Sequence, residues 1–408
     1  MKKYKFRKWL AGSVAVFMTA SLCACASDPK EETKLPVSED PVYQVNLDAI
    51  SPAAYNNVDG LNLKAGSYIS IIGRGSGDSY WNTLASGVKQ AADDINEALG
   101  YTGNDKVKVT YNAPDKSTDI DDQVNILDEE LSRYPDVIGI ASVDAAACQV
   151  QFDLATESDI PIVAFDSSNN YDGILCVVKT DNISAAAAVA DNLSTEIKDS
   201  GSILILSQDS ASATSMDRVK GFTDELQANH PNILIAETLY NDKMDELKEA
   251  IIKEQNENNA GDSADSADAG TDAAANTDAP TDNGAAAADL SDEDVIQYYL
   301  EKHPDVRAIY TTNTTTTQLA VSACKQMNRM SSTTIVGFDA GRTQLDSLKN
   351  GEVQGLLVQN PFGMGYATVV ACARTILEQG NEAVVNTGYT WVTKDNMDDE
   401  AIANLLYE

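Results

Sequence analysis

Two kinds of segment alternate along most of this chain. Short apolar runs rich in β-branched residues are typical of buried strands, and segments with apolar residues every three or four positions are typical of amphipathic helices. The first half has such runs at residues 68–72, 107–111, 137–140, 160–165 and 173–179, with helical patterns between the first four. This alternation predicts a mostly parallel sheet with helices on both faces.

The same alternation starts again after residue 182. Strand patterns occur at residues 202–206, 233–236, 308–310, 334–338 and 353–358, and helical patterns at 183–197, 213–226, 318–327, 343–348, 366–378 and 399–406. Because 408 residues are enough for about two domains, we expect an α/β protein with two similar lobes, each built on a doubly wound parallel sheet.

A glycine-rich turn follows the first predicted strand at residues 73–82 and carries Ser76, Asp78, Tyr80 and Trp81. Ligands of open α/β sheets bind outside the carboxyl ends of the strands, so this turn is a candidate ligand-binding loop. Two adjacent aromatic side chains cannot face the same way, and we therefore expect at least one to face a cleft. A dinucleotide fingerprint does not fit, because the third glycine has the wrong offset and bulky residues begin the helix.

The amino-acid composition narrows the classes of ligand and of catalytic site that the chain could have. The formal net charge of -34 disfavours binding to nucleic acid and anionic lipid, and fits an uncharged or cationic small ligand. The chain has only 2 histidines and no CxxC pair, which argues against a zinc site or a cysteine–histidine catalytic site. The sequence contains no serine-elbow motif that would suggest a hydrolase. We expect neither an enzyme, a cofactor nor a metal.

The N-terminus reads as an export signal. Basic residues precede an apolar run at residues 9–22, which is short for a membrane span, and Leu22-Cys23-Ala24-Cys25 follows. The last four residues resemble the bacterial lipobox, which implies a signal peptide over residues 1–24 and a lipid on Cys25. Cys23 departs from the commonest form, and plain secretory cleavage is the alternative. The polar residues 25–65 are expected to form a flexible tether.

Four further cysteines lie in apolar patterns: Cys148, Cys176, Cys324 and Cys372. This context favours free thiols packed in the core, although an exported protein could also pair them.

Residues 254–292 form a low-complexity acidic insertion that interrupts a helical pattern. Such a composition cannot bury a core, so we expect a disordered surface insertion. Its acids lack the alternating spacing with glycine of an EF-hand loop, which argues against a calcium site.

Seven motifs resemble, in order, those of the type 1 periplasmic binding proteins, in particular the ribose-binding-like solute-binding proteins of sugar ABC transporters. They are Asp78-Ser79-Tyr80-Trp81, Ile160-Pro161-Ile162-Val163 with Asp166, Thr180-Asp181-Asn182, Arg218-Val219-Lys220-Gly221-Phe222, His303-Pro304-Asp305-Val306 leading to Asn313, Val336-Gly337-Phe338-Asp339, and Gln359-Asn360-Pro361-Phe362. The Lac repressor core shares this fold, but the export signal and the lack of a DNA-binding helix pair before residue 68 argue against that role.

The resemblance implies two lobes joined by three crossing segments near residues 180–182, 359–361 and 389–392. The N-terminal lobe would comprise residues 66–181 and 361–390, and the C-terminal lobe residues 182–360 and 391–408. It also implies a clamp for a sugar or similar small polar ligand, delivered to an ABC transporter permease outside the cytoplasm. We expect a monomer.

The resemblance and the chemistry of sugars point to the same site residues. A sugar needs aromatic rings for its C–H faces and fixed carboxylates or amides for its hydroxyls. The expected ligand-binding residues are Tyr80, Trp81, Asp166, Asn313, Asp339 and Gln359, with Asp78 and Ser76.

Three departures from ribose binders leave the ligand open. Ser167 and Met216 stand where arginines are usual, and Thr314 replaces an acid. The ligand could be another sugar, a deoxy sugar or a different small polar molecule. Two other functions also stay open: a sensor that presents its liganded form to a membrane receptor or histidine kinase, and a purely structural lipoprotein.

Overall fold

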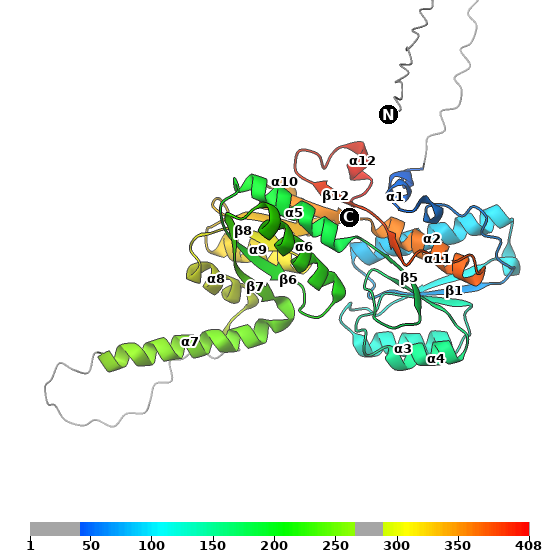
Figure 1. Cartoon of the computed structure of the whole chain (residues 1–408), viewed down its shortest axis with the longest axis horizontal. Helices are drawn as coiled ribbons and strands as arrows, with labels where there is room; N and C mark the ends of the chain where they lie inside the picture. The colour runs from blue at the N-terminus through cyan, green and yellow to red at the C-terminus, as the bar shows by residue number, and fades with distance from the viewer. Residues whose placement is uncertain (1–40, 266–288, 408) are drawn as a thin grey trace, which may run out of the picture. The chain divides into compact units, whose positions relative to one another are not determined.

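The computed structural model describes residues 41–265 and 289–407, which fall within one compact unit beginning at Pro41. The predicted signal peptide, Cys25 and residues 25–40 of the predicted tether lie outside the described residues. The fold contains two six-stranded sheets with flanking helices (Figure 1). The prediction of an α/β protein with two lobes is confirmed.

The first lobe is built on a sheet in which all neighbouring strands are parallel. Its strand order is β11-β5-β4-β3-β1-β2. Helices α2 and α11 cover one face, and α3 and α4 the other (Figure 1). The strands are β1 (Tyr68–Ile72), β2 (Lys108–Asn112), β3 (Val137–Ile140), β4 (Ile162–Phe165), β5 (Ile174–Lys179) and β11 (Val384–Asn386), and the helices are α2 (Ser79–Leu99), α3 (Ile120–Leu131), α4 (Gln149–Glu157) and α11 (Pro361–Ile376).

The second lobe repeats this plan with the strand order β12-β10-β9-β8-β6-β7. Only β12 is antiparallel to its neighbour. The strands are β6 (Gly201–Ser207), β7 (Ile233–Tyr240), β8 (Val306–Thr311), β9 (Thr334–Phe338), β10 (Gly355–Gln359) and β12 (Tyr389–Val392). The helices are α5 (Asn182–Glu196), α6 (Ala213–Asn229), α7 (Met244–Asp265), α8 (Asp292–Lys302), α9 (Thr314–Gln326), α10 (Arg342–Lys349) and α12 (Glu400–Ala403).

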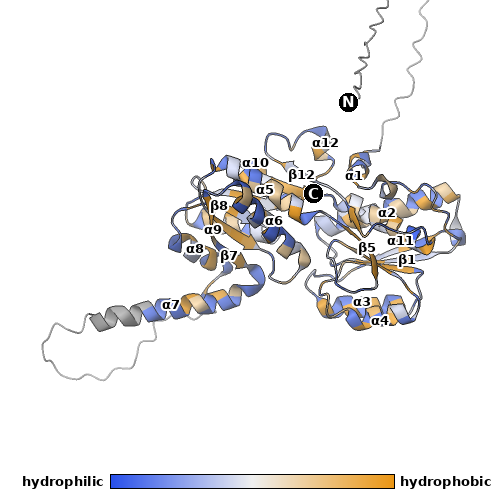
Figure 2. Ribbon diagram, in the orientation of Figure 1, coloured by the Kyte–Doolittle hydropathy of each residue, from blue (hydrophilic) through white to orange (hydrophobic). Residues whose placement is uncertain are grey.

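The apolar runs become central strands because both of their faces are covered. All five residues of β1 and all five of β10 are buried. The outer helices alternate between hydrophobic and hydrophilic residues (Figure 2). None of the described helices combines the length and the apolar content needed to cross a bilayer.

The chain passes between the sheets three times, after β5, after β10 and after β11. The crossing segments bond to one another: Thr180 Oγ1 donates to Gln359 Oε1 over 3.0 Å, and Asn360 Nδ2 donates to the Thr387 carbonyl over 2.9 Å. The third crossing lies at residues 387–388, slightly earlier than expected, because Tyr389 already pairs with Gln359 in the second sheet.

The structure differs from the expectation of a flexible tether up to residue 65. Residues 41–65 contain α1 (Gln44–Asp48) and a 3-10 helix (Ala53–Tyr55), and their apolar side chains join the core of the first lobe. Ser51 also exchanges two backbone hydrogen bonds with Asn386 in β11. These apolar residues are spaced without a helix or strand period, so the sequence pattern did not reveal them. The buried ones are Leu47, Ile50, Tyr55, Leu61 and Leu63.

The structure also differs from the expectation of a disordered insertion that begins at residue 254, because α7 continues to Asp265. Lys302 in α8 forms a 2.9 Å ion pair with Glu254, which ties the two helices together where disorder was expected to begin. Helix α8 starts at a capping box formed by Ser291 and Asp294. Residues 266–288 of the insertion lie outside the described residues.

The four cysteines of the described chain are free and buried. Burial raises the pKa of Cys148 to about 11 and that of Cys176 to about 12, so both thiols are protonated at neutral pH. They contribute packing rather than reactivity.

Helices α2 and α11 approach closely through glycine. A Cβ atom on Gly87 would lie 2.0 Å from the Phe362 carbonyl oxygen. We expect Gly87→Ala to lower the free energy of unfolding by about 1–3 kcal/mol, although alanine favours helix, because the helices must separate. Urea unfolding measures this. Ser86→Ala, at the exposed neighbouring position, is the control; equal stability of both variants would contradict the close contact.

Candidate ligand-binding site

A cavity of about 470 Å³ opens where strand ends of the two lobes meet. Both lobes contribute to its wall, as expected for a ligand site at the carboxyl ends of parallel strands. Of the eight residues predicted from the sequence, seven line it: Asp78, Tyr80, Trp81, Asp166, Asn313, Asp339 and Gln359. Ser76 does not; its hydroxyl donates to the Pro114 carbonyl over 3.2 Å.

Asp166 and Asp339 occupy equivalent places in the two lobes. Asp166 directly follows β4 and Asp339 directly follows β9, with φ of 52° and 76° respectively. Each backbone N–H donates over 2.9 Å to a carbonyl of the next strand, Val178 for Asp166 and Leu357 for Asp339. Aspartate tolerates this left-handed conformation better than most residues. The two lobes thus turn one carboxylate each toward the same cavity.

Neighbouring side chains fix the Asp166 carboxylate. The Tyr80 hydroxyl donates to Asp166 Oδ1 over 2.6 Å, and Ser167 Oγ donates to Oδ2 over 3.2 Å. Burial and the Asp166 charge raise the pKa of Tyr80 well above its usual value, so its hydroxyl stays protonated and acts as a donor.

The Asp339 carboxylate is held from the second lobe and the hinge. Its Oδ1 accepts from Gln359 Nε2 over 2.7 Å and from the Tyr407 hydroxyl over 3.2 Å. Burial raises the pKa of Asp339 above its usual value, while the nearby Arg218 guanidinium opposes this and the Asp166 charge adds to it. Because Gln359 also accepts from Thr180, a continuous chain of hydrogen bonds joins a hinge crossing to this carboxylate.

The two aromatic residues of the first turn have different environments. Trp81 is only 5% exposed and packs mainly in the core of the first lobe. The Tyr80 ring lies edge-on to Trp81, with centroids 5.1 Å apart, and edge-on to Tyr407, with centroids 5.8 Å apart. Tyr80 therefore contacts residues that belong to the cores of both lobes.

Asp78 and Asn313 serve both the fold and the cavity wall. Asp78 Oδ1 accepts from the Trp81 backbone N–H over 2.9 Å and caps α2, while Asn313 Oδ1 accepts from the Thr316 backbone N–H over 3.0 Å and caps α9. Such caps are the ordinary role of these residue types at helix starts. Burial is the main cause that raises the pKa of Asp78.

Three arginines that were not predicted as site residues also line the cavity: Arg74, Arg218 and Arg342. Arg74 Nη1 reaches Ser167 Oγ at 3.4 Å, so its guanidinium approaches the position where ribose binders carry an arginine. Arg218 is 3% exposed, donates to the Asn182 side chain and the Thr312 carbonyl, and lies over the Phe338 ring. Guanidinium groups are thus present despite Ser167 and Met216.

Tyr407 is the residue that sequence reasoning had least chance of finding. It follows a short C-terminal helix, is 3% exposed, and its hydroxyl also accepts from the Ala340 backbone N–H over 3.1 Å. No motif surrounds it, and only the folded chain brings it to Asp339. Arg218, by contrast, lies within a family motif of the sequence, although its burial is seen only in the fold.

The cavity combines acceptors, donors and an aromatic ring. Three carboxylates can accept hydroxyl hydrogen bonds, and three guanidinium groups and the amides can donate. Its volume is that of a small-molecule site. The arrangement suits a compact molecule with several hydroxyl groups.

Comparison with known proteins places the chain in a family. A family model described as a periplasmic binding protein domain matches residues 69–288 and 276–380. The chain therefore belongs to this family. No curated protein sequence matches it.

Solved structures share the fold at low sequence identity. A carbohydrate transporter solute-binding protein from Agrobacterium radiobacter, in complex with D-arabinose, is 23% identical, with a TM-score of 0.63 over 84% of this chain and 99% of that one. The glucose-galactose binding protein GanP from Geobacillus stearothermophilus is 21% identical, with a TM-score of 0.63 over 82% and 99%. An Agrobacterium vitis ABC transporter solute-binding protein with bound D-fucose is 22% identical, with a TM-score of 0.62 over 84% and 100%. The fold is thus that of sugar ABC transporter solute-binding proteins.

The raised pKa of Asp339 predicts that its ionised carboxylate lowers the stability of the ligand-free protein. Above the ordinary aspartate pKa, ionisation is easier in the unfolded chain than in the ligand-free fold, so stability is lost as pH rises from about 4 through the folded pKa. We expect Asp339→Asn to raise the melting temperature of the ligand-free protein at pH 7, and the difference from the unchanged protein to shrink toward pH 4.

Thermal unfolding across this pH range measures the effect. Asp128→Asn, which removes a charge from the exposed face of α3, is the matched control and should change the melting temperature little. A lower melting temperature for Asp339→Asn at pH 7 would show that the ionised carboxylate stabilises the fold instead.

Proposed function

We propose that this protein is an extracytoplasmic solute-binding lipoprotein that clamps a sugar or similar small polar ligand between its lobes and delivers it to an ABC transporter permease. The observation that carries the proposal is the matched pair Asp166 and Asp339, which reach one cavity from opposite lobes with the same backbone geometry. The resemblance of Leu22-Cys23-Ala24-Cys25 to a lipobox supports a lipid anchor on Cys25.

The proposed clamp has a simple energetic basis. A hydrogen bond to a charged group contributes about 1.5–3 kcal/mol, so a few bonds to Asp166, Asp339 and Arg218 are enough for micromolar affinity. A ligand that bonds to both carboxylates at once binds the closed form more tightly than a form with separated lobes. Binding therefore shifts the population toward closure.

The proposed ligand contacts are the seven predicted residues that line the cavity, together with Arg74, Arg218 and Tyr407. Tyr80 would supply a ring to the C–H face of a sugar. Several of the similar structures contain a bound monosaccharide, among them D-arabinose, D-fucose and D-allose, which supports a monosaccharide as the ligand here.

A thermal-shift screen against monosaccharides, polyols and nucleosides should identify the ligand, followed by calorimetric titration. We expect Asp166→Ala and Asp339→Ala each to weaken binding at least about tenfold, which corresponds to about 1.4 kcal/mol, because each leaves ligand hydroxyls without an acceptor. Asp128→Ala on the outer surface of the first lobe is the control.

Two results would contradict the proposal. One is the absence of any ligand-induced shift across the panel, and the other is nearly unchanged affinity in both carboxylate variants. Trp81→Ala is a poor substitute for these variants, because removing a 5% exposed tryptophan costs about 3–5 kcal/mol of stability by itself.

A further inference from the structure

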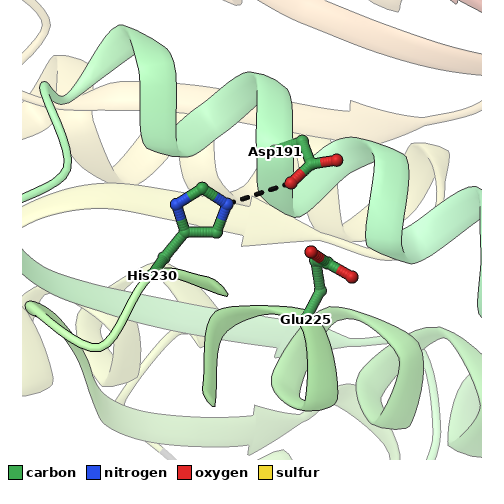
Figure 3. Close-up of side chains that lie close together, drawn as sticks. All are labelled: Asp191, Glu225 and His230. Atoms are coloured by element: carbon green, nitrogen blue, oxygen red, sulfur yellow. Dashed lines mark hydrogen bonds and ion pairs between the residues drawn. The ribbon is translucent and has the colours of Figure 1, made fainter. Parts of the chain in front are cut away.

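Three potential metal-ligating side chains meet at one end of the helix pair α5 and α6 in the second lobe (Figure 3). Asp191 comes from α5, Glu225 from α6, and His230 from the position that ends α6. One ligand atom from each lies within 4.8 Å of the other two. None of the three lines the cavity between Asp166 and Asp339.

The His230 ring is held between carboxylates on both sides. Its Nε2 lies 2.9 Å from Asp191 Oδ1 (Figure 3). On the other side of the ring, Nδ1 lies 2.6 Å from Asp199 Oδ1. The His230 side chain is only 16% exposed, whereas that of Asp191 is 60% exposed. The His230 ring is therefore held in one orientation, whereas the exposed Asp191 side chain has room to change its rotamer.

The cluster has more negative charge than its own residues neutralise. Three carboxylates surround a single imidazole, and within the described parts of the chain no lysine or arginine forms an ion pair with Asp191, Asp199 or Glu225. Of the residues that the structure describes, the Asn229 side-chain amide donates to Glu225. Either a proton on Nε2 or a cation must separate Nε2 from the Asp191 carboxylate.

We propose that His230 Nε2 and the carboxylates of Asp191 and Glu225 bind a divalent transition-metal ion such as Zn²⁺. Asp199 is the positioning residue: by accepting a hydrogen bond from Nδ1–H, it leaves the Nε2 lone pair facing the other two ligands, the arrangement typical of metal-bound histidine. One nitrogen and two oxygen ligands suit zinc, with water as the fourth ligand, better than calcium or magnesium, which prefer oxygen alone.

The proposed ion would link the ends of α5 and α6. All of its ligands belong to the second lobe, so it would stabilise that lobe without being part of the sugar clamp. Binding to the folded state raises the melting temperature, and the stabilisation grows with the logarithm of the ratio of metal concentration to dissociation constant. This inference does not depend on the proposed function.

Calorimetric titration of the tag-free protein with ZnCl₂ tests the site, with Co²⁺ absorption as a report on coordination geometry. We expect one saturable site of micromolar affinity and a tetrahedral Co²⁺ spectrum that Zn²⁺ abolishes. His230→Gln, Asp191→Asn and Glu225→Gln should each weaken binding at least about tenfold, and Asp199→Asn about 10- to 100-fold. Asp224→Asn is the matched control, because it removes an exposed carboxylate from the same helix.

Two outcomes would overturn the proposal. One is the absence of saturable binding up to millimolar Zn²⁺, which would leave His230 as an imidazolium held between Asp191 and Asp199. The other is an equal loss of binding in Asp224→Asn and in the ligand variants, which would indicate adsorption to an acidic surface. If His230→Gln does not fold, the zinc affinity of Glu225→Gln, a substitution at a helix surface, tests the proposed site instead.

Discussion

Two carboxylates of like charge face one cavity from opposite lobes, and most features of the site follow from this constraint. Burial of Asp339 and the nearby Asp166 charge both disfavour the ionised form of Asp339 and raise its pKa. Hydroxyl and amide donors hold the two carboxylates in place, Tyr80 for Asp166 and Gln359 with Tyr407 for Asp339. The remaining acceptor capacity is what a hydroxylated ligand could satisfy.

The hinge and the cavity are physically connected. Thr180, at the first crossing, donates to Gln359 at the end of β10, and Gln359 donates to Asp339. Across the cavity, Tyr80 from the first lobe contacts Tyr407, which packs in the core of the second. Movement of one lobe would therefore change the surroundings of both carboxylates. A ligand bonded to both would oppose that movement, and this coupling is what ligand-driven closure of the lobes requires.

The sequence predicted the features that depend on local pattern. Both sheets, the ends of β4 and β9 and the seven cavity-lining residues lie in periodic segments or short motifs. The rest depends on long-range packing. Leu47 and Tyr55 follow no period but are buried in the first lobe, Tyr407 reaches Asp339 only through the folded C-terminal segment, and Trp81 packs inward while Tyr80 faces the second lobe. The helical continuation of α7 to Asp265 also went against a composition typical of disorder.

The most direct test of the clamp is the distance between the lobes with and without the ligand found by screening. Spin labels at Asp128→Cys in α3 and Glu249→Cys in α7 would report it, since both positions are exposed and the four cysteines in the described chain are buried. The account predicts that ligand shifts the distance distribution to a narrower, single population, and that Asp166→Ala with Asp339→Ala abolishes the shift. An unchanged distribution at saturating ligand would contradict it.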